Sequence, residues 1–98
     1  MPDVVTRRVE RYVRACFDAS EAELVLAVLG EWRISYEEEP PSERLITAVV
    51  LAADGRLDGV DDALQTAEQD WRDLLVGAGL ANGDWSAILD ARLGPDVD

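Results

Sequence analysis

The run LITAVVLAA, residues 45–53, constrains the fold of this chain more than any other stretch. No charged residue interrupts it, and Thr47 is its only polar member. A short apolar run can be a buried strand or a buried helix, and periodicity alone does not separate the two. In either form it offers almost no polar surface to water, so we expect it to be the buried central element.

The residues around this run decide between helix and strand. The β-branched side chains of the run favour a strand. Ser42 can cap a helix that starts at Glu43, and the carboxylate of Glu43 suits the positive end of the helix dipole. Gly55 can take the left-handed conformation that ends many helices, and the alanines of the run favour helix. These signals predict a helix at residues 43–54.

Length and composition place the chain among small folded proteins. Its 98 residues suffice for one core, and a hydrophobic content of 48% argues against disorder. No apolar stretch reaches the roughly 18 residues that a membrane-spanning helix needs, and the N-terminus lacks the apolar core of a signal peptide. We therefore expect a cytoplasmic protein. The single cysteine, Cys16, agrees with a reducing compartment because it cannot form a disulfide within the chain.

The charge of the chain limits its partners and its chemistry. The formal net charge is −12, which opposes binding to nucleic acid and to anionic membranes and favours basic partners. All nine basic residues are arginines, and histidine is absent. The lack of histidine removes serine–histidine and cysteine–histidine catalysis and disfavours the usual zinc sites. We therefore predict no catalytic residue, no cofactor and no metal.

Hydrophobic periodicity predicts helices along the whole chain. We expect an all-α protein, a single compact orthogonal bundle of about five helices, in one domain that spans residues 1–98. An acidic connector that contains proline joins the second and third helices at residues 37–42, and residues 94–98 form a frayed tail. The expected helices are residues 3–18, 21–36, 43–54, 59–76 and 85–93.

The first expected helix, with Asp3 as its cap and Cys16 on its apolar face, differs from the others in charge. The arginines on its opposite face are Arg7, Arg8, Arg11 and Arg14. This face is either solvated and paired with the protein's own acids, or a stripe that binds a partner. A similar choice applies to the connector, which is either a solvated linker or an acidic lip for a basic partner. Its acids are Glu37, Glu38 and Glu39.

Local signals describe the second expected helix. Ser20 and Glu23 match a capping box at its start. Gly30 lies inside it, and glycine costs about 1 kcal/mol against alanine there, so we expect a neighbouring helix to approach closely at this point. Its apolar residues form a broad arc that we expect to face the core: Leu24, Val25, Val28, Leu29, Trp32 and Tyr36.

The fourth and fifth expected helices carry two of the three tryptophans. Asp58 is the expected cap of the fourth helix, and Trp71 lies in the middle of its apolar stripe, where we expect it to be buried. Gly77 and Gly79 should end this helix. Asp84 is the expected cap of the fifth helix, which closes the core with Trp85, Ile88 and Leu89.

The segment DGRLDGVDD, residues 54–62, resembles the second half of an EF-hand calcium loop. The first two acidic ligand positions of such a loop would fall on Val50 and Ala52, which cannot bind calcium. The segment is therefore interpreted as a turn followed by a helix cap.

Two pairs of acids, Asp58/Asp61 and Asp70/Asp73, have the i, i+3 spacing that all-helical pyrophosphatases use to hold magnesium. Both pairs lie on one expected helix, and the chain has no lysine to bind a phosphate. A metal-dependent nucleotide hydrolase is therefore kept only as a further alternative.

Residues 41–93 resemble a group of short uncharacterised helical proteins of actinobacterial type. The strongest match is DWRDLLVGAGLANGDW, residues 70–85, and shorter matches occur at Arg44-Leu45, Ala48-Val49 and the Gly55 turn. The resemblance covers about half of the chain. It implies a small all-helical bacterial domain, and it implies no activity, cofactor or catalytic residue.

Three functions of different classes follow from these observations. The first is a non-catalytic protein–protein interaction or accessory domain, which needs only a helical scaffold. The second is an acidic antagonist of a basic surface, such as a nucleic-acid mimic, an antitoxin or an immunity protein, because residues 19–98 hold 18 acids and five arginines. The third is the nucleotide hydrolase. The expected partner is another protein or a second copy of the chain, with the arginine-rich helix at or near the interface of a homodimer.

Overall fold

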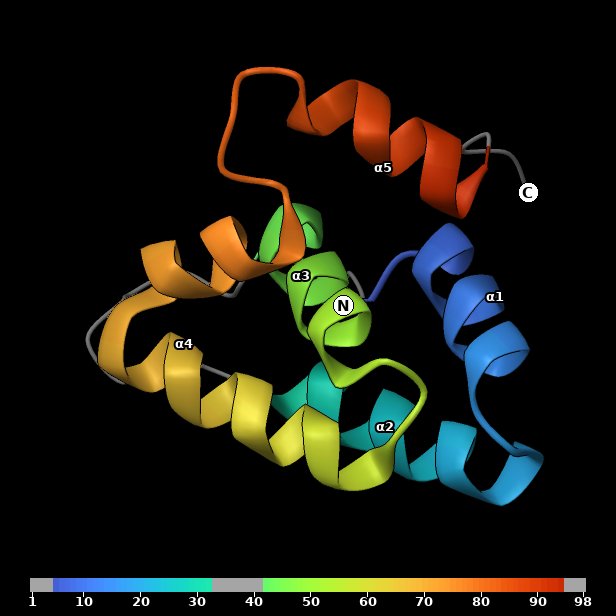
Figure 1. Ribbon diagram of the computed structural model, residues 1–98. Coiled ribbons are helices and arrows are strands. Elements are labelled where there is room, and N and C mark those ends of the chain that lie inside the picture. Colours follow the sequence, from blue (N-terminus) through green and yellow to red (C-terminus); the bar gives the residue numbers. More distant parts are fainter. Residues whose placement is uncertain (1–4, 33–41, 95–98) are drawn as a thin grey trace.

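Five α-helices run through the residues that the computed structural model describes, 5–32 and 42–94 (Figure 1). No strand occurs within these ranges, so the prediction of an all-α protein is confirmed. The predicted connector, apart from Ser42, and the tail beyond Gly94 lie outside the described residues. The helices are α1 (Arg7–Cys16), α2 (Ala19–Glu31), α3 (Glu43–Ala53), α4 (Leu57–Ala78) and α5 (Trp85–Leu93).

Helix α3 is the central element, as the apolar run predicts. Figure 1 shows it between α4 on one side and α1 and α5 on the other, and its most extensive contact is with α4. The Ser42 hydroxyl oxygen accepts a hydrogen bond from the Leu45 N–H at 3.3 Å, so the predicted cap is confirmed. The helix ends at Ala53, one residue early, because Asp54 already takes the left-handed conformation (φ 53°). The buried residues are Ile46, Thr47, Ala48, Val49, Val50 and Ala53.

The Thr47 hydroxyl is fully buried and, within the part of the chain that the structure describes, has no hydrogen-bond partner. A buried hydroxyl without a partner destabilises a fold because it has lost its hydrogen bonds to water. Thr47→Val keeps the β-branched shape and removes that hydroxyl. We expect it to raise the free energy of unfolding by about 1 kcal/mol in urea denaturation.

The matched control is Thr66→Val on α4, because Thr66 is exposed. Its hydroxyl already donates to the carbonyl oxygen of Asp62 at 3.0 Å. This substitution should change the free energy of unfolding by no more than about 0.5 kcal/mol. A Thr47→Val protein less stable than the parent would show that the hydroxyl does have a stabilising partner.

The chain turns sharply between α3 and α4, and a glycine permits the close contact there. Gly59 is buried, and a Cβ atom at this position would lie 2.5 Å from the Ala53 carbonyl oxygen. The predicted close approach at Gly30 is wrong, because Gly30 is exposed and a Cβ atom there would meet open space. Of these two glycines, only Gly59 therefore lies at a close contact between helices.

Helix α4 is longer than predicted and contains a break. It begins at Leu57, with Arg56 at the cap position, so Asp58 lies in the first turn and the predicted cap is wrong. Asp70 has extended backbone angles (φ −161°, ψ 105°), and its Oδ1 accepts a hydrogen bond from the Arg72 N–H at 3.0 Å. This is the geometry of an N-cap. Asp70 therefore ends the first half of α4 and caps the second.

Of the two glycines that were predicted to end α4, only Gly79 does so. The helix continues through Gly77 and stops before Gly79, which is left-handed (φ 80°). The Gly79 N–H donates to the Val76 carbonyl oxygen at 3.2 Å, and the Leu80 N–H donates to the Leu75 carbonyl oxygen at 2.9 Å. These two bonds form a Schellman motif, which satisfies carbonyl groups at the helix end.

The first two helices start at different residues from those predicted. Thr6, which precedes α1, is its cap and accepts from the Val9 N–H at 3.4 Å, so a start at residue 3 is wrong. Helix α2 begins at Ala19 after Asp18, which places Ser20 inside the first turn, and the predicted capping box is therefore wrong. Glu31 ends α2, and the rest of the predicted second helix beyond Trp32 lies outside the described residues.

The three tryptophans are buried to different extents. Trp32 is 8% exposed and belongs to the core. Trp71, which was expected to be buried, packs against the core but is only partly buried, and it follows directly on the break in α4. Trp85 is also partly buried, and the Arg44 guanidinium lies over its ring at 4.9 Å.

Helix α5 has the predicted bounds, and the side chains of Leu89 and Leu93 on its inner face are buried. None of the helices in the described ranges is long and apolar enough to cross a membrane.

Candidate functional site

One of the four arginines of α1 is buried in an ion-pair cluster. Arg8, whose side chain is 9% exposed, donates to both carboxylate oxygens of Glu43 on α3, at 2.6 and 2.9 Å. It also donates to Asp90 of α5 at 2.8 Å and to the carbonyl oxygen of Gly94 at 3.3 Å. The two parallel bonds to Glu43 are the bidentate geometry that arginine favours. Arg8 therefore links α1 to α3 and α5. Because its side chain is buried in these contacts, it does not belong to an exposed arginine stripe that could bind a partner.

The charges of this cluster stabilise one another. Hydrogen bonds to Glu43, and then to Asp90, raise the pKa of Arg8. The hydrogen bonds from Arg8 hold the pKa of Glu43 below its usual value of 4.5, against the opposing effect of burial, and the Thr6 hydroxyl adds a bond at 2.6 Å. Both groups are therefore charged at neutral pH, and the cluster has a structural role.

The lowered pKa of Glu43 makes part of the stability depend on pH. The unfolded chain binds a proton at Glu43 more readily than the folded chain does, so the contribution of the pair is complete above the unfolded pKa. It is lost as pH falls through the folded pKa. We therefore expect the difference in unfolding free energy between the parent and Glu43→Gln to be constant above about pH 6 and to shrink below about pH 4.

Urea denaturation at a series of pH values measures this difference, and Glu23→Gln is the control. Glu23 forms an exposed ion pair with Arg14 at 2.8 Å, so its substitution should have a small effect at every pH. Comparison of each variant with the parent cancels the repulsion among the other acids, which also changes with pH. A Glu43→Gln difference of the same size at pH 3 and pH 7 would contradict the assignment.

The remaining arginines of α1 are exposed, but the structure gives them partners inside the chain. Arg14 pairs with Glu10 at 3.2 Å and with Glu23 at 2.8 Å, which confirms for this residue the prediction of a solvated face paired with the protein's own acids. Arg11 donates to the carbonyl oxygen of Leu93 at 2.9 Å. Together with Arg7 and Val5, these side chains line a shallow hollow on the outer face of α1. Glu37, Glu38 and Glu39 lie outside the described residues.

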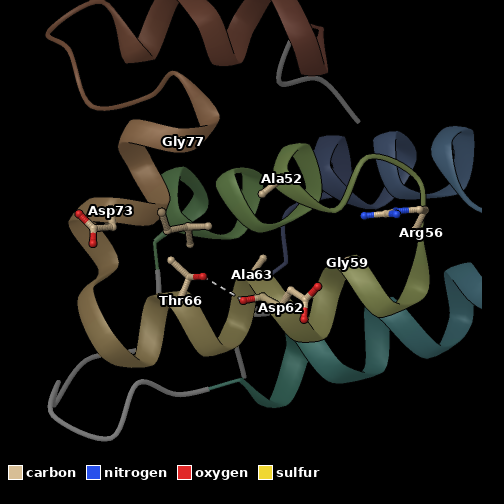
Figure 2. Close-up of a pocket in the computed structure, with 9 residues that line it drawn as sticks. Ala52, Arg56, Gly59, Asp62, Ala63, Thr66, Asp73 and Gly77 are labelled. Carbon is tan, nitrogen blue, oxygen red and sulfur yellow. Dashed lines mark hydrogen bonds between the residues drawn. The ribbon is translucent and has the colours of Figure 1, made fainter.

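A groove lies between the end of α3 and the two halves of α4 (Figure 2). Its volume is about 310 Å³. Figure 2 shows Arg56 at one end and Asp73 at the other, with Asp62 and Thr66 between them on α4. Small residues leave this space open: Ala52, Gly59, Ala63 and Gly77. The groove is polar at both ends and has no concentrated group of ionisable side chains.

The structure does not bring the carboxylate pairs Asp58/Asp61 and Asp70/Asp73 together in one site. Because Asp70 caps the second half of α4, it does not share a continuous helix with Asp73. Asp73 lines the groove, whereas Asp58 and Asp61 do not. Across residues 5–32 and 42–94, no three cysteine, aspartate or glutamate side chains are grouped so that they could hold a metal ion.

A second hollow, of about 300 Å³, lies where α1 meets the end of α3 and α5. It is lined by Tyr12, Cys16, Asp54 and Arg92, among others. Burial raises the pKa of Tyr12, the neighbouring Cys16 raises it further, and Arg92 opposes the shift. Cys16 was expected on the buried face of α1, but it is exposed, because the chain leaves α1 at Phe17, which takes the core position instead.

The outer face of α2 carries apolar side chains that the core does not cover. Leu24 is 55% exposed and Val28 is 42% exposed, although both were expected in the core. The two are four residues apart, so they lie one above the other on the helix surface, and the exposed Ala27 lies beside them. The core instead takes the opposite face of α2, through Ala22, Val25 and Leu29. We call Leu24, Ala27 and Val28 the outer stripe.

Acidic residues surround the outer stripe. On the helical wheel Glu21 lies beside Val28, Glu23 lies beyond Ala27 on the other side, and Glu31 continues the line of the stripe at the C-terminal end. Helix α2 carries no basic residue. The surface therefore combines an apolar centre with negatively charged edges.

Searches with this chain find no matching protein-family model, no matching curated protein and no matching solved structure.

Proposed function

We propose that this chain is a non-catalytic protein-interaction domain of the cytoplasm, and that it binds another protein through the outer stripe of α2. The observation that carries the proposal is the exposure of Leu24 and Val28 on adjacent turns of one helix. Contiguous apolar side chains on the surface of a small protein are typical of sites that a partner covers. About half of each of these two side chains is exposed, on the part of α2 that faces away from Ala22 and Leu29.

The distribution of apolar residues around α2 supports the same proposal. A helix at the surface of a globular protein normally has one apolar and one polar face. Here Val25 and Leu29 face the core, while Leu24 and Val28 face outward. Apolar residues on both faces are expected when both faces are covered, and among residues 5–32 and 42–94 the outer face of α2 keeps Leu24 and Val28 exposed.

Site-specific photo-crosslinking tests the proposal in cells of the source organism. A photoreactive residue at position 28 should form one discrete adduct, and Leu24→Gln in the same protein should abolish it. The control places the photoreactive residue at position 76 on α4, because Val76 is also apolar and 67% exposed but has no apolar neighbour of this kind. An adduct with twice the mass of the chain would identify a homodimer instead. If position 28 gives no adduct, or only the adducts of position 76, the proposal is wrong.

An antagonist of a basic surface is the second candidate, and the first half of α4 favours it. Asp58, Asp61 and Asp62 are exposed on successive turns and Glu68 continues the series. Acids at this spacing present negative charge along one side of the helix. This candidate predicts a partner whose binding falls steeply with salt and does not depend on Leu24 or Val28.

A further inference from the structure

The acids around the outer stripe restrict the chemistry of its partner. Within the described parts of the chain, neither Glu21 nor Glu31 takes part in an ion pair, whereas Glu23 is paired with Arg14. A partner that covers Leu24 and Val28 removes water from around these carboxylates as well, and such burial is unfavourable unless positive charges meet them. The edges of the partner surface must therefore be basic.

The position of Glu31 strengthens this restriction. It occupies the last turn of α2, where the helix dipole is negative and an acidic side chain is unfavourable. No basic residue lies in that turn to offset it. The charge of Glu31 is therefore unfavourable for α2 itself, and it lies in line with the outer stripe.

A second copy of the chain does not meet both requirements. Pairing of α2 with α2 would join the two apolar stripes, but it would also bring Glu21 and Glu31 of each copy together without any basic residue from that helix. Pairing of α2 with the outer face of α1 would supply arginines, but that face offers Arg7, Glu10, Arg11 and Arg14 and no apolar stripe. Neither of these two faces therefore supplies both an apolar stripe and basic edges.

We propose that the outer stripe of α2 binds an amphipathic helix of another protein, whose apolar stripe is flanked by lysine or arginine. This inference rests on the proposed interaction function and names the class of partner. The 13 residues of α2 extend about 20 Å, which matches three to four turns of a partner helix. Leu24 and Val28 contact the apolar residues of that helix, and Glu21 and Glu31 contact its basic edges.

Two synthetic peptides test the proposal. Both are designed amphipathic helices with the same leucine stripe, one with lysine and arginine edges and the other with glutamate edges. Fluorescence anisotropy with the full chain should show saturable binding of the basic peptide and at least about tenfold weaker binding of the acidic peptide. Circular dichroism of the free peptides shows whether their helix contents match.

Protein variants assign the binding to the outer stripe. Leu24→Gln with Val28→Gln should weaken binding of the basic peptide at least about tenfold, and Val76→Gln should leave it unchanged. Glu21→Gln with Glu31→Gln should weaken it about three- to tenfold at low salt and less at about 0.5 M salt. All five side chains are at least partly exposed on α2 or α4, and circular dichroism confirms that each variant is folded.

The outcomes separate this inference from the proposed function. Equal binding of both peptides, with loss in the Leu24/Val28 variant, would contradict the basic partner but leave α2 as the docking surface. If the Leu24/Val28 substitutions do not weaken binding of the basic peptide, both the inference and the proposed function are contradicted. Attraction to the acidic surface alone would then explain the binding. If neither peptide binds, the partner class is wrong, and photo-crosslinking at position 28 then decides whether α2 binds any protein.

Discussion

Arg8→Ala is expected to lower the free energy of unfolding by about 3 kcal/mol. The substitution leaves the Glu43 carboxylate, which is mostly buried, without the guanidinium that donates to both of its oxygens. It also removes the bonds from α1 to Asp90 and Gly94 at α5. A loss of this size is a large part of the stability of a small domain. Urea denaturation at neutral pH measures it.

Arg14→Ala is the matched control, because Arg14 lies on the same helix and also contacts two carboxylates. Its ion pairs are exposed to solvent, so we expect a change of about 0.5 kcal/mol. Arg8→Lys keeps the charge but loses the forked donors. Its free energy of unfolding should therefore lie between those of the parent and Arg8→Ala. Equal effects of Arg8→Ala and Arg14→Ala would contradict the structural role of the cluster.

Gly59→Ala is expected to destabilise the protein by about 2 kcal/mol, although alanine is the better helix former. The new methyl group would lie 2.5 Å from the Ala53 carbonyl oxygen and 2.9 Å from its Cα atom. Both are backbone atoms, so the contact can be relieved only if α3 and α4 move apart.

Gly30→Ala provides the control with the opposite sign. A methyl group there meets open space, so only the helix preference of alanine remains, and we expect stabilisation of up to about 1 kcal/mol. Both variants are compared by thermal and urea denaturation. A stabilising Gly59→Ala would show that α3 and α4 are not in close contact at their turn.

The central helix could be predicted because its signals are local. Ser42, Glu43 and the apolar run lie next to one another, and each acts on the helix that contains it. The bounds of α5 were also predicted from the residues at its two ends, Asp84 and Gly94, although the Asp84 side chain makes no capping hydrogen bond. The resemblance of residues 41–93 to short actinobacterial-type proteins stays a prediction.

The break in α4 was missed although a signal for it exists. The apolar stripe of α4 continues on both sides of Asp70, from Ala67 to Trp71, and that periodicity predicts one helix across it. However, an aspartate followed three residues later by the acidic Asp73 is also the pattern of a helix start. The structure shows that the cap prevails, with Asp70 bonded to the Arg72 N–H.

The burial of Arg8 and the exposure of Leu24 and Val28 depended on tertiary contacts and could not be derived from one helix at a time. Arg8 lies at the edge of the apolar face of α1, whereas Arg7, Arg11 and Arg14 lie opposite that face. This position hints at burial, but its acids come from α3 and α5, far away in the sequence. Likewise, Leu24 and Val28 are as apolar as Val25 and Leu29, and only the packing of α2 shows which pair faces the core.

The direct test of the α2 docking surface is an NMR titration of the full isotope-labelled chain with the basic amphipathic peptide. The backbone amide signals of residues 20–31 should shift progressively and saturate, and the signals around Val76 should stay in place. Leu24→Gln with Val28→Gln should remove these shifts. Shifts concentrated on the exposed acids of α4, at Asp58, Asp61 and Asp62, or on the groove at Arg56, would contradict the assignment of the site to α2.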